Sequence, residues 1–346
     1  MKLAAACVLT ALVLGPAPAR ADSSRRRDVV DLTRLELLRT VEKGWSHSIA
    51  PGGQAFAIFD ANTVRVYDTF EGKEIQTLNG HTGLIHDSGW SRDGRYLATS
   101  GYDASVRVWD VTTGKEIQKL YPHAGYACSV AFSADGKTLA TGGSEDGLIK
   151  LFDVATGRNI LPIQTPDLSI YAVTFTPDGR HLVVNHSLAN RADSSLRIFQ
   201  TANGAEVKPP ATGPVTAFAV SRDGRNIAYS NARGTIVVLE TQGWTEVRRL
   251  EGHQSGASSI SFHPVSRYVA STGRDGAVRI WDVDASRTIH TLNVKPETDS
   301  RLVFGADGAT LVVSSADGSV RVFGRQEVGG RVSGAPVPAA KPLPGR

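Results

Sequence analysis

The sequence of 346 residues carries 38 basic and 34 acidic side chains, so its formal net charge at pH 7 is only +4. It has 35 glycines but one methionine, a balance that disfavours a helical protein and favours many short strands joined by tight turns. The small charge also argues against a nucleic-acid-binding protein, which would carry a strongly basic surface.

The first element is a leader at residues 1–21. Lys2 precedes an apolar run at 3–14, and small residues at 19–21 resemble a cleavage site, which together predict a secretory signal peptide. The run is shorter than the roughly 20 apolar residues that a membrane-spanning helix needs. We therefore expect an exported protein, periplasmic or secreted, without a stable membrane anchor.

Residues 22–32 read as a linker after the predicted cleavage site. Loss of Lys2 and Arg20 would leave 36 basic against 34 acidic residues. Cys7 lies ahead of most of the apolar run, which disfavours a lipoprotein. Only Cys128 would remain after processing, so no internal disulfide could form, and its apolar neighbours place it on a buried strand.

A repeat of about forty-two residues organises the rest of the chain. Each unit has a strand that ends in a large, mostly aromatic residue, and successive residues of this kind are 42, 43, 47, 40, 42 and 42 positions apart. They are Tyr67, Trp109, Phe152, Phe199, Leu239, Trp281 and Phe323. A turn between the first two strands of each unit is a second landmark, and in five units it contains Asp-Gly, sixteen to twenty-one residues before the large residue. The pattern predicts seven units, each of four strands, with the alternation typical of half-buried strands.

Such units bury their faces only against neighbours, so the array must be capped or closed. The seventh unit lacks a good fourth strand, whereas an extra strand, 33–40, precedes the first unit. We expect this strand to complete the last sheet and close a propeller over residues 33–324. The tail, 325–346, is rich in Pro, Gly and Ala and is predicted to be disordered.

The second and sixth units resemble the WD-repeat family, the second by residues 81–120 (HTGLIHDSGWSRDGRYLATSGYDASVRVWDVTTGKEIQKL). The resemblance implies an all-β, seven-bladed β-propeller of four-stranded antiparallel blades. It also implies a rigid surface for other proteins or peptides, since few members are enzymes.

The family often locks a blade with a hydrogen-bond chain of histidine, hydroxyl, aspartate and tryptophan. By resemblance, two units carry it whole: His81, Ser100, Asp103 and Trp109, and His253, Ser271, Asp275 and Trp281. We interpret these residues as structural, although a catalytic role for the His, Ser and Asp side chains is the competing interpretation.

Signatures of catalysis are missing from the sequence. It has no H-E-x-x-H zinc motif, no G-x-S-x-G elbow and no paired-cysteine metal site. Asp87 is the one acidic residue that we place on an inner strand, so a pair of carboxylates lacks its second member. We predict no catalytic residue, no metal and no cofactor.

A partner surface is expected on the rim formed by the loop before each first strand and the turn before each third strand. One position at the start of each inner strand, which we call the inner column, differs between units: Trp45, His86, Cys128, Tyr171, Thr216, Ser258 and Ser300. The rim candidates are Trp45, His86 and Tyr171 in the inner column, Tyr102, Glu145 and Arg274 in turns, and Arg191 in the longest turn. We predict a non-catalytic scaffold for an unknown protein or peptide, as a monomer or as a subunit of a hetero-complex. The alternative is an envelope enzyme or a ligand-binding propeller that uses the central channel.

Overall fold

The computed structural model describes residues 32–42, 47–165, 169–187, 195–207, 213–294, 300–315 and 317–324. All of them belong to the second of two compact units of the chain, which begins at Leu32. Within these ranges the only helical element is a short 3-10 turn, η1 (Leu32–Arg34), and the remaining regular structure is β-strand. The predicted all-β fold class is confirmed.

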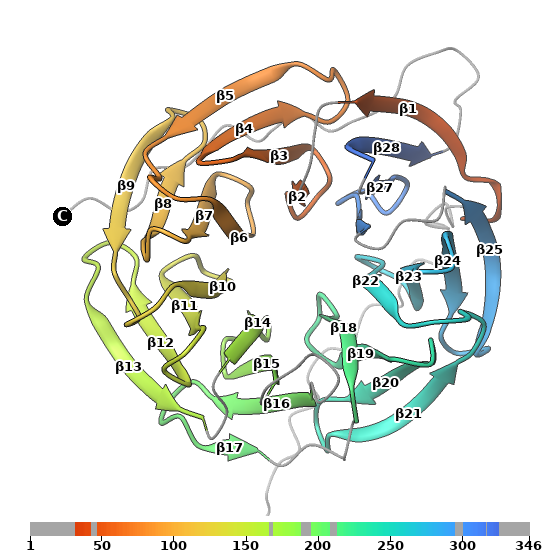
Figure 1. Cartoon of the computed structure of the whole chain (residues 1–346). Coiled ribbons are helices and arrows are strands. Elements are labelled where there is room, and N and C mark those ends of the chain that lie inside the picture. The colour runs from red at the N-terminus through yellow and green to blue at the C-terminus, as the bar shows by residue number, and fades with distance from the viewer. Residues whose placement is uncertain are drawn as a thin grey trace, which may run out of the picture. The chain divides into compact units, whose positions relative to one another are not determined.

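Seven four-stranded antiparallel sheets form the blades of a ring (Figure 1). Blades 1 and 2 contain β2 (His47–Ile49), β3 (Ala55–Asp60), β4 (Thr63–Asp68), β5 (Glu74–Asn79), β6 (Ile85–Trp90), β7 (Tyr96–Gly101), β8 (Val106–Asp110) and β9 (Lys115–Leu120). Blades 3 and 4 contain β10 (Ala127–Phe132), β11 (Thr138–Gly143), β12 (Leu148–Asp153), β13 (Asn159–Gln164), β14 (Ser169–Phe175), β15 (His181–Ser187), β16 (Ser195–Gln200) and β17 (Glu206–Val207).

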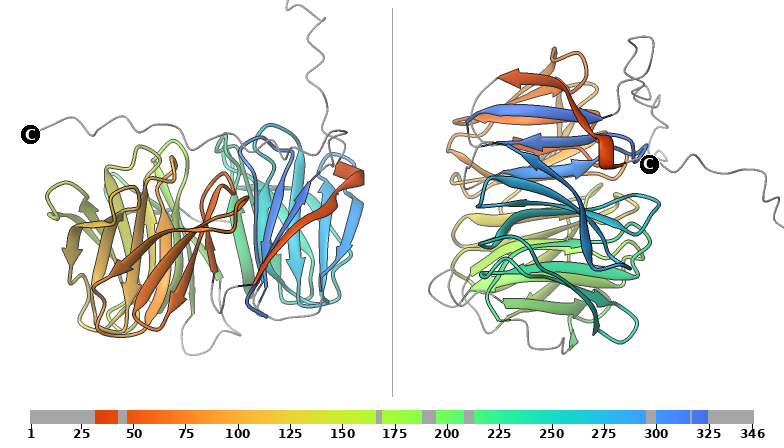
Figure 2. Two further views of the ribbon diagram at one scale, coloured as in Figure 1. Left: turned by 90° about the horizontal axis from the view of Figure 1, so that it is seen from above. Right: turned by 90° about the vertical axis from the view of Figure 1, so that its right-hand side faces the viewer.

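Blades 5 and 6 contain β18 (Val215–Val220), β19 (Asn226–Asn231), β20 (Ile236–Glu240), β21 (Thr245–Leu250), β22 (Ala257–Phe262), β23 (Tyr268–Gly273), β24 (Ala277–Asp282) and β25 (Arg287–Asn293). Blade 7 contains β26 (Arg301–Phe304), β27 (Leu311–Ser314), β28 (Ser319–Gly324) and, as its outer strand, β1 (Glu36–Glu42). The strands stand side by side with their turns at the two ends of each blade (Figure 2).

The turn between the first two strands of a blade is built from its own side chains. In blade 2, Ser91 Oγ donates to Asp93 Oδ1 at 2.6 Å, and the same carboxylate oxygen accepts from the backbone N–H of Arg95 at 3.1 Å. Gly94 takes a φ of 72°, which favours glycine. This arrangement explains why the sequence repeats Asp-Gly at this point.

The core consists of apolar layers between neighbouring blades. Between blades 1 and 2, for example, the buried layer includes Val66, Trp90, Leu97 and Trp109. Because each blade presents apolar side chains to both neighbours, no blade can bury its faces alone.

Closure of the ring follows the prediction. β1 pairs antiparallel with β28, with Glu36 opposite Gly324 and Glu42 opposite Ser319 (Figure 1, dark red beside blue). The strand begins at Glu36, three residues later than predicted, because Leu32–Arg34 forms the 3-10 turn. Chain segments from both ends of the propeller therefore share one sheet.

Several sequence-based predictions fall on residues that the structure does not describe. These are the signal peptide at 1–21, most of the linker at 22–32, the tail at 325–346, Trp45 and Arg191. In the described ranges no helix has the length and apolar character to cross a membrane. Cys128 lies buried on β10, as its neighbours predict.

Candidate interaction surface

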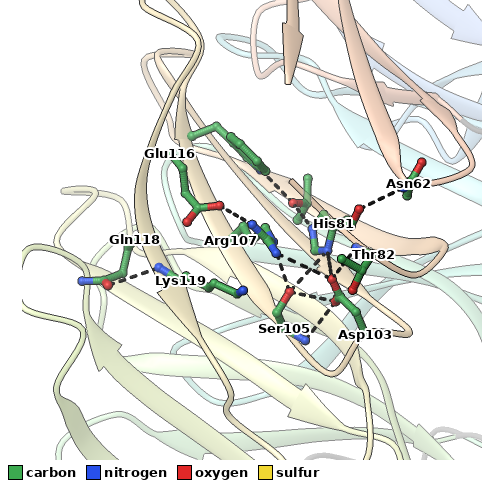
Figure 3. Close-up of polar contacts among 11 residues, drawn as sticks. Asn62, His81, Thr82, Asp103, Ser105, Arg107, Glu116, Gln118 and Lys119 are labelled. Carbon is green, nitrogen blue, oxygen red and sulfur yellow. Dashed lines mark hydrogen bonds and ion pairs between the residues drawn. The ribbon is translucent and has the colours of Figure 1, made fainter. Parts of the chain in front are cut away.

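The histidine, aspartate and tryptophan of blade 2 are joined by one hydroxyl. His81 Nδ1 lies 3.0 Å from Asp103 Oδ2 (Figure 3). His81 Nε2 lies 2.8 Å from Thr99 Oγ1. Trp109 Nε1 donates to the same Thr99 oxygen at 2.9 Å. The hydroxyl is therefore that of Thr99 and not that of Ser100, so the assignment of Ser100 is wrong.

Blade 6 contains the equivalent chain. His253 Nδ1 lies 3.0 Å from Asp275 Oδ1, and His253 Nε2 lies 2.8 Å from Ser271 Oγ. Trp281 Nε1 donates to Ser271 Oγ at 2.8 Å. Blade 3 keeps the histidine, His123, but its strand ends in Phe152, which has no donor.

The charges of these groups fit a structural role. Burial lowers the pKa of His81, although Asp103 acts in the opposite direction. Burial would raise the pKa of Asp103, but hydrogen bonds from the Thr82 N–H and from Ser105 outweigh it and lower the pKa well below the ordinary value. The pair is thus a carboxylate beside a neutral imidazole.

These residues cannot reach a substrate. The His81 and His253 side chains have no exposed surface, and both ring nitrogens of each already have polar partners. A general base needs an accessible atom within hydrogen-bond reach of the reacting proton. The histidine, aspartate and hydroxyl groups therefore serve here to connect the loop before the first strand of a blade to its second and third strands.

A second layer of ion pairs extends the chain of blade 2 to its outer strand. Arg107 Nε donates to Ser105 Oγ at 3.2 Å, and Arg107 Nη1 lies 2.5 Å from Glu116 Oε2 on β9 (Figure 3). The Arg107 side chain is nearly buried, and these partners compensate its positive charge. This network connects three of the four strands of the blade.

Three aromatic rings from blades 2 and 3 meet on the rim. His86 lies on β6, Tyr102 in the turn after β7, and Tyr126 in the loop before β10. Their ring centroids are 5.6 Å apart for His86 and Tyr102, 5.7 Å for His86 and Tyr126, and 4.6 Å for Tyr102 and Tyr126. We call these three residues the rim cluster.

Backbone hydrogen bonds fix the rim cluster in place. The N–H of Tyr102 donates to the carbonyl of Leu84 at 2.8 Å, and the N–H of Ser144 donates to the carbonyl of Tyr126 at 3.1 Å. His86 Nδ1 lies 3.0 Å from the Cys128 carbonyl of the next blade. The rings are thus held by two blades at once, as a preformed surface.

The surroundings of the rim cluster are apolar and acidic. Leu84 and Tyr102 are 58% and 53% exposed, large values for apolar side chains. Burial raises the pKa of Tyr126, and Cys128, Tyr102, Glu145 and Tyr171 add to the increase, so a carboxylate lies within electrostatic reach of the rings. An exposed aromatic patch beside a charge is typical of a protein interface.

The inner column predicted from the sequence coincides with β-bulges. In each of five blades the register of the inner strand shifts at the column residue: His86, Cys128, Tyr171, Thr216 and Ser258. A bulge leaves one residue out of the regular pairing and redirects its side chain. Side chains at these positions can therefore vary without breaking the blade.

The predicted rim residues divide into two groups. His86, Tyr102, Glu145 and Tyr171 gather around Tyr126, whereas Arg274 is exposed in blade 6, on the other side of the ring. Tyr126 was missed because it precedes β10 by one residue and lies outside the inner column. Its position in the loop before a first strand, predicted from the sequence to form the rim, could have identified it as a rim residue.

The channel wall carries Asp87 on β6. Its Oδ2 accepts the N–H of Val130 from the next blade at 3.2 Å. Burial raises the pKa of Asp87, although Arg301 and backbone donors act in the opposite direction. Among the described residues, no group of three or more His, Cys, Asp or Glu side chains is arranged to hold a metal ion.

Comparison with known proteins identifies the repeat. Residues 72–110, 114–153 and 244–282 match the family described as "WD domain, G-beta repeat". Each match begins near the fourth strand of one blade and ends with the third strand of the next, so the sequence repeat is offset from the blade.

Similar proteins include the Target of rapamycin complex subunit wat1 of Schizosaccharomyces pombe, 25% identical over 185 residues, or 51% of this chain and 56% of the relative. Protein groucho of Drosophila melanogaster is 29% identical over 182 residues, or 51% of this chain and 25% of the relative. WD repeat-containing protein VIP3 of Arabidopsis thaliana is 27% identical over 145 residues, or 38% of this chain and 44% of the relative. The alignments thus span at most about half of each relative.

Proposed function

The chain is a seven-bladed β-propeller built of WD repeats, and we propose that it acts as a non-catalytic scaffold that binds a protein or peptide partner. The similarity to proteins named as a complex subunit and as a WD repeat-containing protein supports this proposal. The candidate catalytic groups of the sequence support it too, because His81 and His253 are fully enclosed in the blades.

The rim cluster carries the proposal. Tyr102 and Leu84 expose more than half of their surfaces, and the rings of Tyr126 and His86 pack against Tyr102 at centroid distances under 6 Å. Aromatic side chains held rigidly lose little conformational entropy on binding and often contribute much of an interface's energy. Glu145 beside the rings would favour a partner with a basic residue.

We also propose that the protein works outside the cytoplasm, in the cell envelope or beyond the cell. The support is the leader pattern of residues 1–21, with Lys2, an apolar run and a small-residue cleavage site. Mass spectrometry of the protein purified from its own cells should find a mature chain that begins at Asp22. A chain that retains residues 1–21 and fractionates with the cytoplasm would contradict export.

Site-specific crosslinking tests the rim cluster. We would place a photo-reactive phenylalanine at position 102 and, as a control, at position 265, where Val265 is 71% exposed in the turn of blade 6 at the opposite end of the strands. The expected result is one discrete adduct from position 102 in native cells and none from position 265. Mass spectrometry would then identify the partner.

A variant of the rim cluster distinguishes specific binding at position 102 from chance crosslinking of a nearby protein. Tyr126→Ala removes the support of Tyr102 while leaving the crosslinker in place, so the adduct should decrease several-fold. Equal adducts from both positions, or an adduct that Tyr126→Ala leaves unchanged, would show that the rim cluster is not the interface. Circular dichroism would confirm that the variant is folded.

A further inference from the structure

Trp244 occupies a turn position that four other blades fill with glycine. The position lies four residues after the end of the third strand, and its occupants are Gly72, Gly114, Gly157, Gly204, Trp244 and Ser286 in blades 1 to 6. All six have positive φ, from 51° to 72°, and Trp244 has 53°. A bulky L-residue is disfavoured there because its Cβ approaches the backbone oxygen.

Strained backbone conformations are concentrated at functional positions, so the Trp244 side chain is a candidate for a function. The Trp244 indole borders a hollow of about 380 Å³ between blades 4 and 5. The His181 ring meets the indole edge to face, with the centroids 5.3 Å apart and an interplanar angle of 81°. The indole also packs against the apolar layer between the two blades, which limits its motion.

The remaining wall of the hollow is polar and carries both signs of charge. Gln200 and Gln242 are exposed, and each amide can both donate and accept hydrogen bonds. Asp178 Oδ1 is occupied by Thr176 and by the N–H of Arg180, at 2.6 and 3.0 Å. The Asp178 carboxylate and the Arg180 guanidinium both line the hollow, so their charges offset each other.

The hollow lies at the end of the blades opposite to the rim cluster. It is formed by the turn after β14 and the turn after β20, whereas the rim cluster uses the turn after β7 and the loops before β6 and β10. Because strands alternate in direction, these two sets of turns lie at opposite ends. The site is therefore independent of the proposed partner surface.

We propose that this hollow binds a neutral saccharide. A pyranose ring has a face of C–H groups that can lie on an indole, and its hydroxyls can pair with the two glutamine amides and the Asp178 carboxylate. The volume suits one or two sugar units. An anionic ligand fits less well, because Asp178 offsets the charge of Arg180.

Fluorine NMR can observe Trp244 directly. The chain contains five tryptophans, so the protein would be labelled with 5-fluorotryptophan, and the fluorine resonance of Trp244 would be assigned as the one missing from Trp244→Phe. Methyl glucosides, N-acetylglucosamine, maltose and cellobiose would be titrated to about 10 mM, above the millimolar Kd expected of a small open site. We expect at least one saccharide to shift this resonance saturably and leave the other resonances in place.

Variants give the controls. Trp244→Gly introduces the residue of blades 1 to 4 and lacks the Trp244 resonance, so its binding would be followed by saturation-transfer NMR of the saccharide and should be abolished. Ser286→Gly changes the same position in blade 6 and should leave binding unchanged. The double change of Gln200→Ala and Gln242→Ala alters exposed side chains only and should weaken binding at least about tenfold at unchanged Tm. Tyr102→Ala should leave saccharide binding intact.

Three outcomes would overturn the proposal. In the first, no saccharide shifts the Trp244 resonance. In the second, inorganic phosphate or a proline-rich peptide shifts it while the saccharides do not, so the ligand class is wrong. In the third, Trp244→Gly binds saccharide as well as the wild type does, so the site lies elsewhere.

Discussion

The indole N–H of Trp109 and the hydroxyl of Thr99 share a buried hydrogen bond of 2.9 Å. The same hydroxyl lies 2.8 Å from His81 Nε2. If the hydroxyl donates to Nε2, the opposite ring nitrogen carries the proton and donates to Asp103. One threonine thus connects a tryptophan on the third strand, through His81, to a carboxylate at the end of the blade.

We expect Thr99→Ala to lower the free energy of unfolding by about 1–3 kcal/mol, because it leaves the Trp109 N–H and His81 Nε2 buried without a partner. The matched control is Ser100→Ala. The Ser100 hydroxyl is buried and makes no hydrogen bond with a described residue, so its removal should change stability by less than about 0.5 kcal/mol. Urea denaturation of both variants measures the difference, and equal losses would contradict the assignment.

The sequence predicted the blades well because turns and strands leave local signals. Asp93 and Gly94 mark a turn by their own hydrogen bond and φ, and the regular return of Trp109 and its equivalents marks the strand. It did not separate Thr99 from Ser100, since neighbouring strand residues face opposite sides and both carry hydroxyls. The constant separation of 18 residues from histidine to hydroxyl in three blades would have settled it.

The surface sites were predicted less completely. His86 and Tyr102 were candidates because the units differ at their positions, but the contact of Tyr126 with them became visible only when blades 2 and 3 were placed side by side. Trp244 was missed for a different reason: it replaces a glycine in a turn, and the cost of that replacement appears only in its φ. Contacts between blades depend on packing that no single repeat encodes.

Removal of β1 tests the closure of the ring. We expect a chain that starts after Glu42 to unfold at lower temperature than a chain that starts at Leu32, because β28 loses its outer partner. Val41 is buried in the apolar layer with Phe56 and Val320. Thermal unfolding followed by circular dichroism would measure both chains.

Two point variants make the same test without truncation. Val41→Ala should destabilise by on the order of 1–2 kcal/mol, since it leaves a cavity between blades 7 and 1. Leu37→Ala changes the same strand at a position that is 50% exposed and should have little effect. If both variants matched the wild type, β1 would contribute no closure energy.

Acidification should destabilise the propeller in the pH range where free histidines titrate. Burial lowers the pKa of His81, His123 and His253 from the ordinary 6.5, so these histidines stay neutral in the folded state while the unfolded chain takes up protons. The unfolded state then binds more protons, and stability falls as pH drops below about 6.5, by at most about 1.4 kcal/mol per pH unit for each histidine. Urea denaturation between about pH 7.5 and pH 5 measures this slope.

A histidine variant identifies the source of the slope. His123→Gln removes one titrating group from blade 3, which has the histidine but no tryptophan at the end of its third strand, and should flatten the slope while lowering stability at neutral pH. Asp317 serves as a reference, since its pKa of about 2 places its titration well below this window. An unchanged slope in His123→Gln would mean that other groups control the pH dependence.

Asp87→Asn tests the cost of a carboxylate on the channel wall. Burial raises the folded-state pKa of Asp87 above its ordinary 3.8, so the folded state binds more protons than the unfolded state in the window above 3.8. Stability contributed by this group therefore falls as pH rises through that window. Asparagine keeps an acceptor for the Val130 N–H without the charge, so we expect Asp87→Asn to be more stable than the wild type at pH 7 and equal to it near pH 4. A variant that is less stable at pH 7 would show instead that attraction to Arg301 outweighs the burial of the carboxylate.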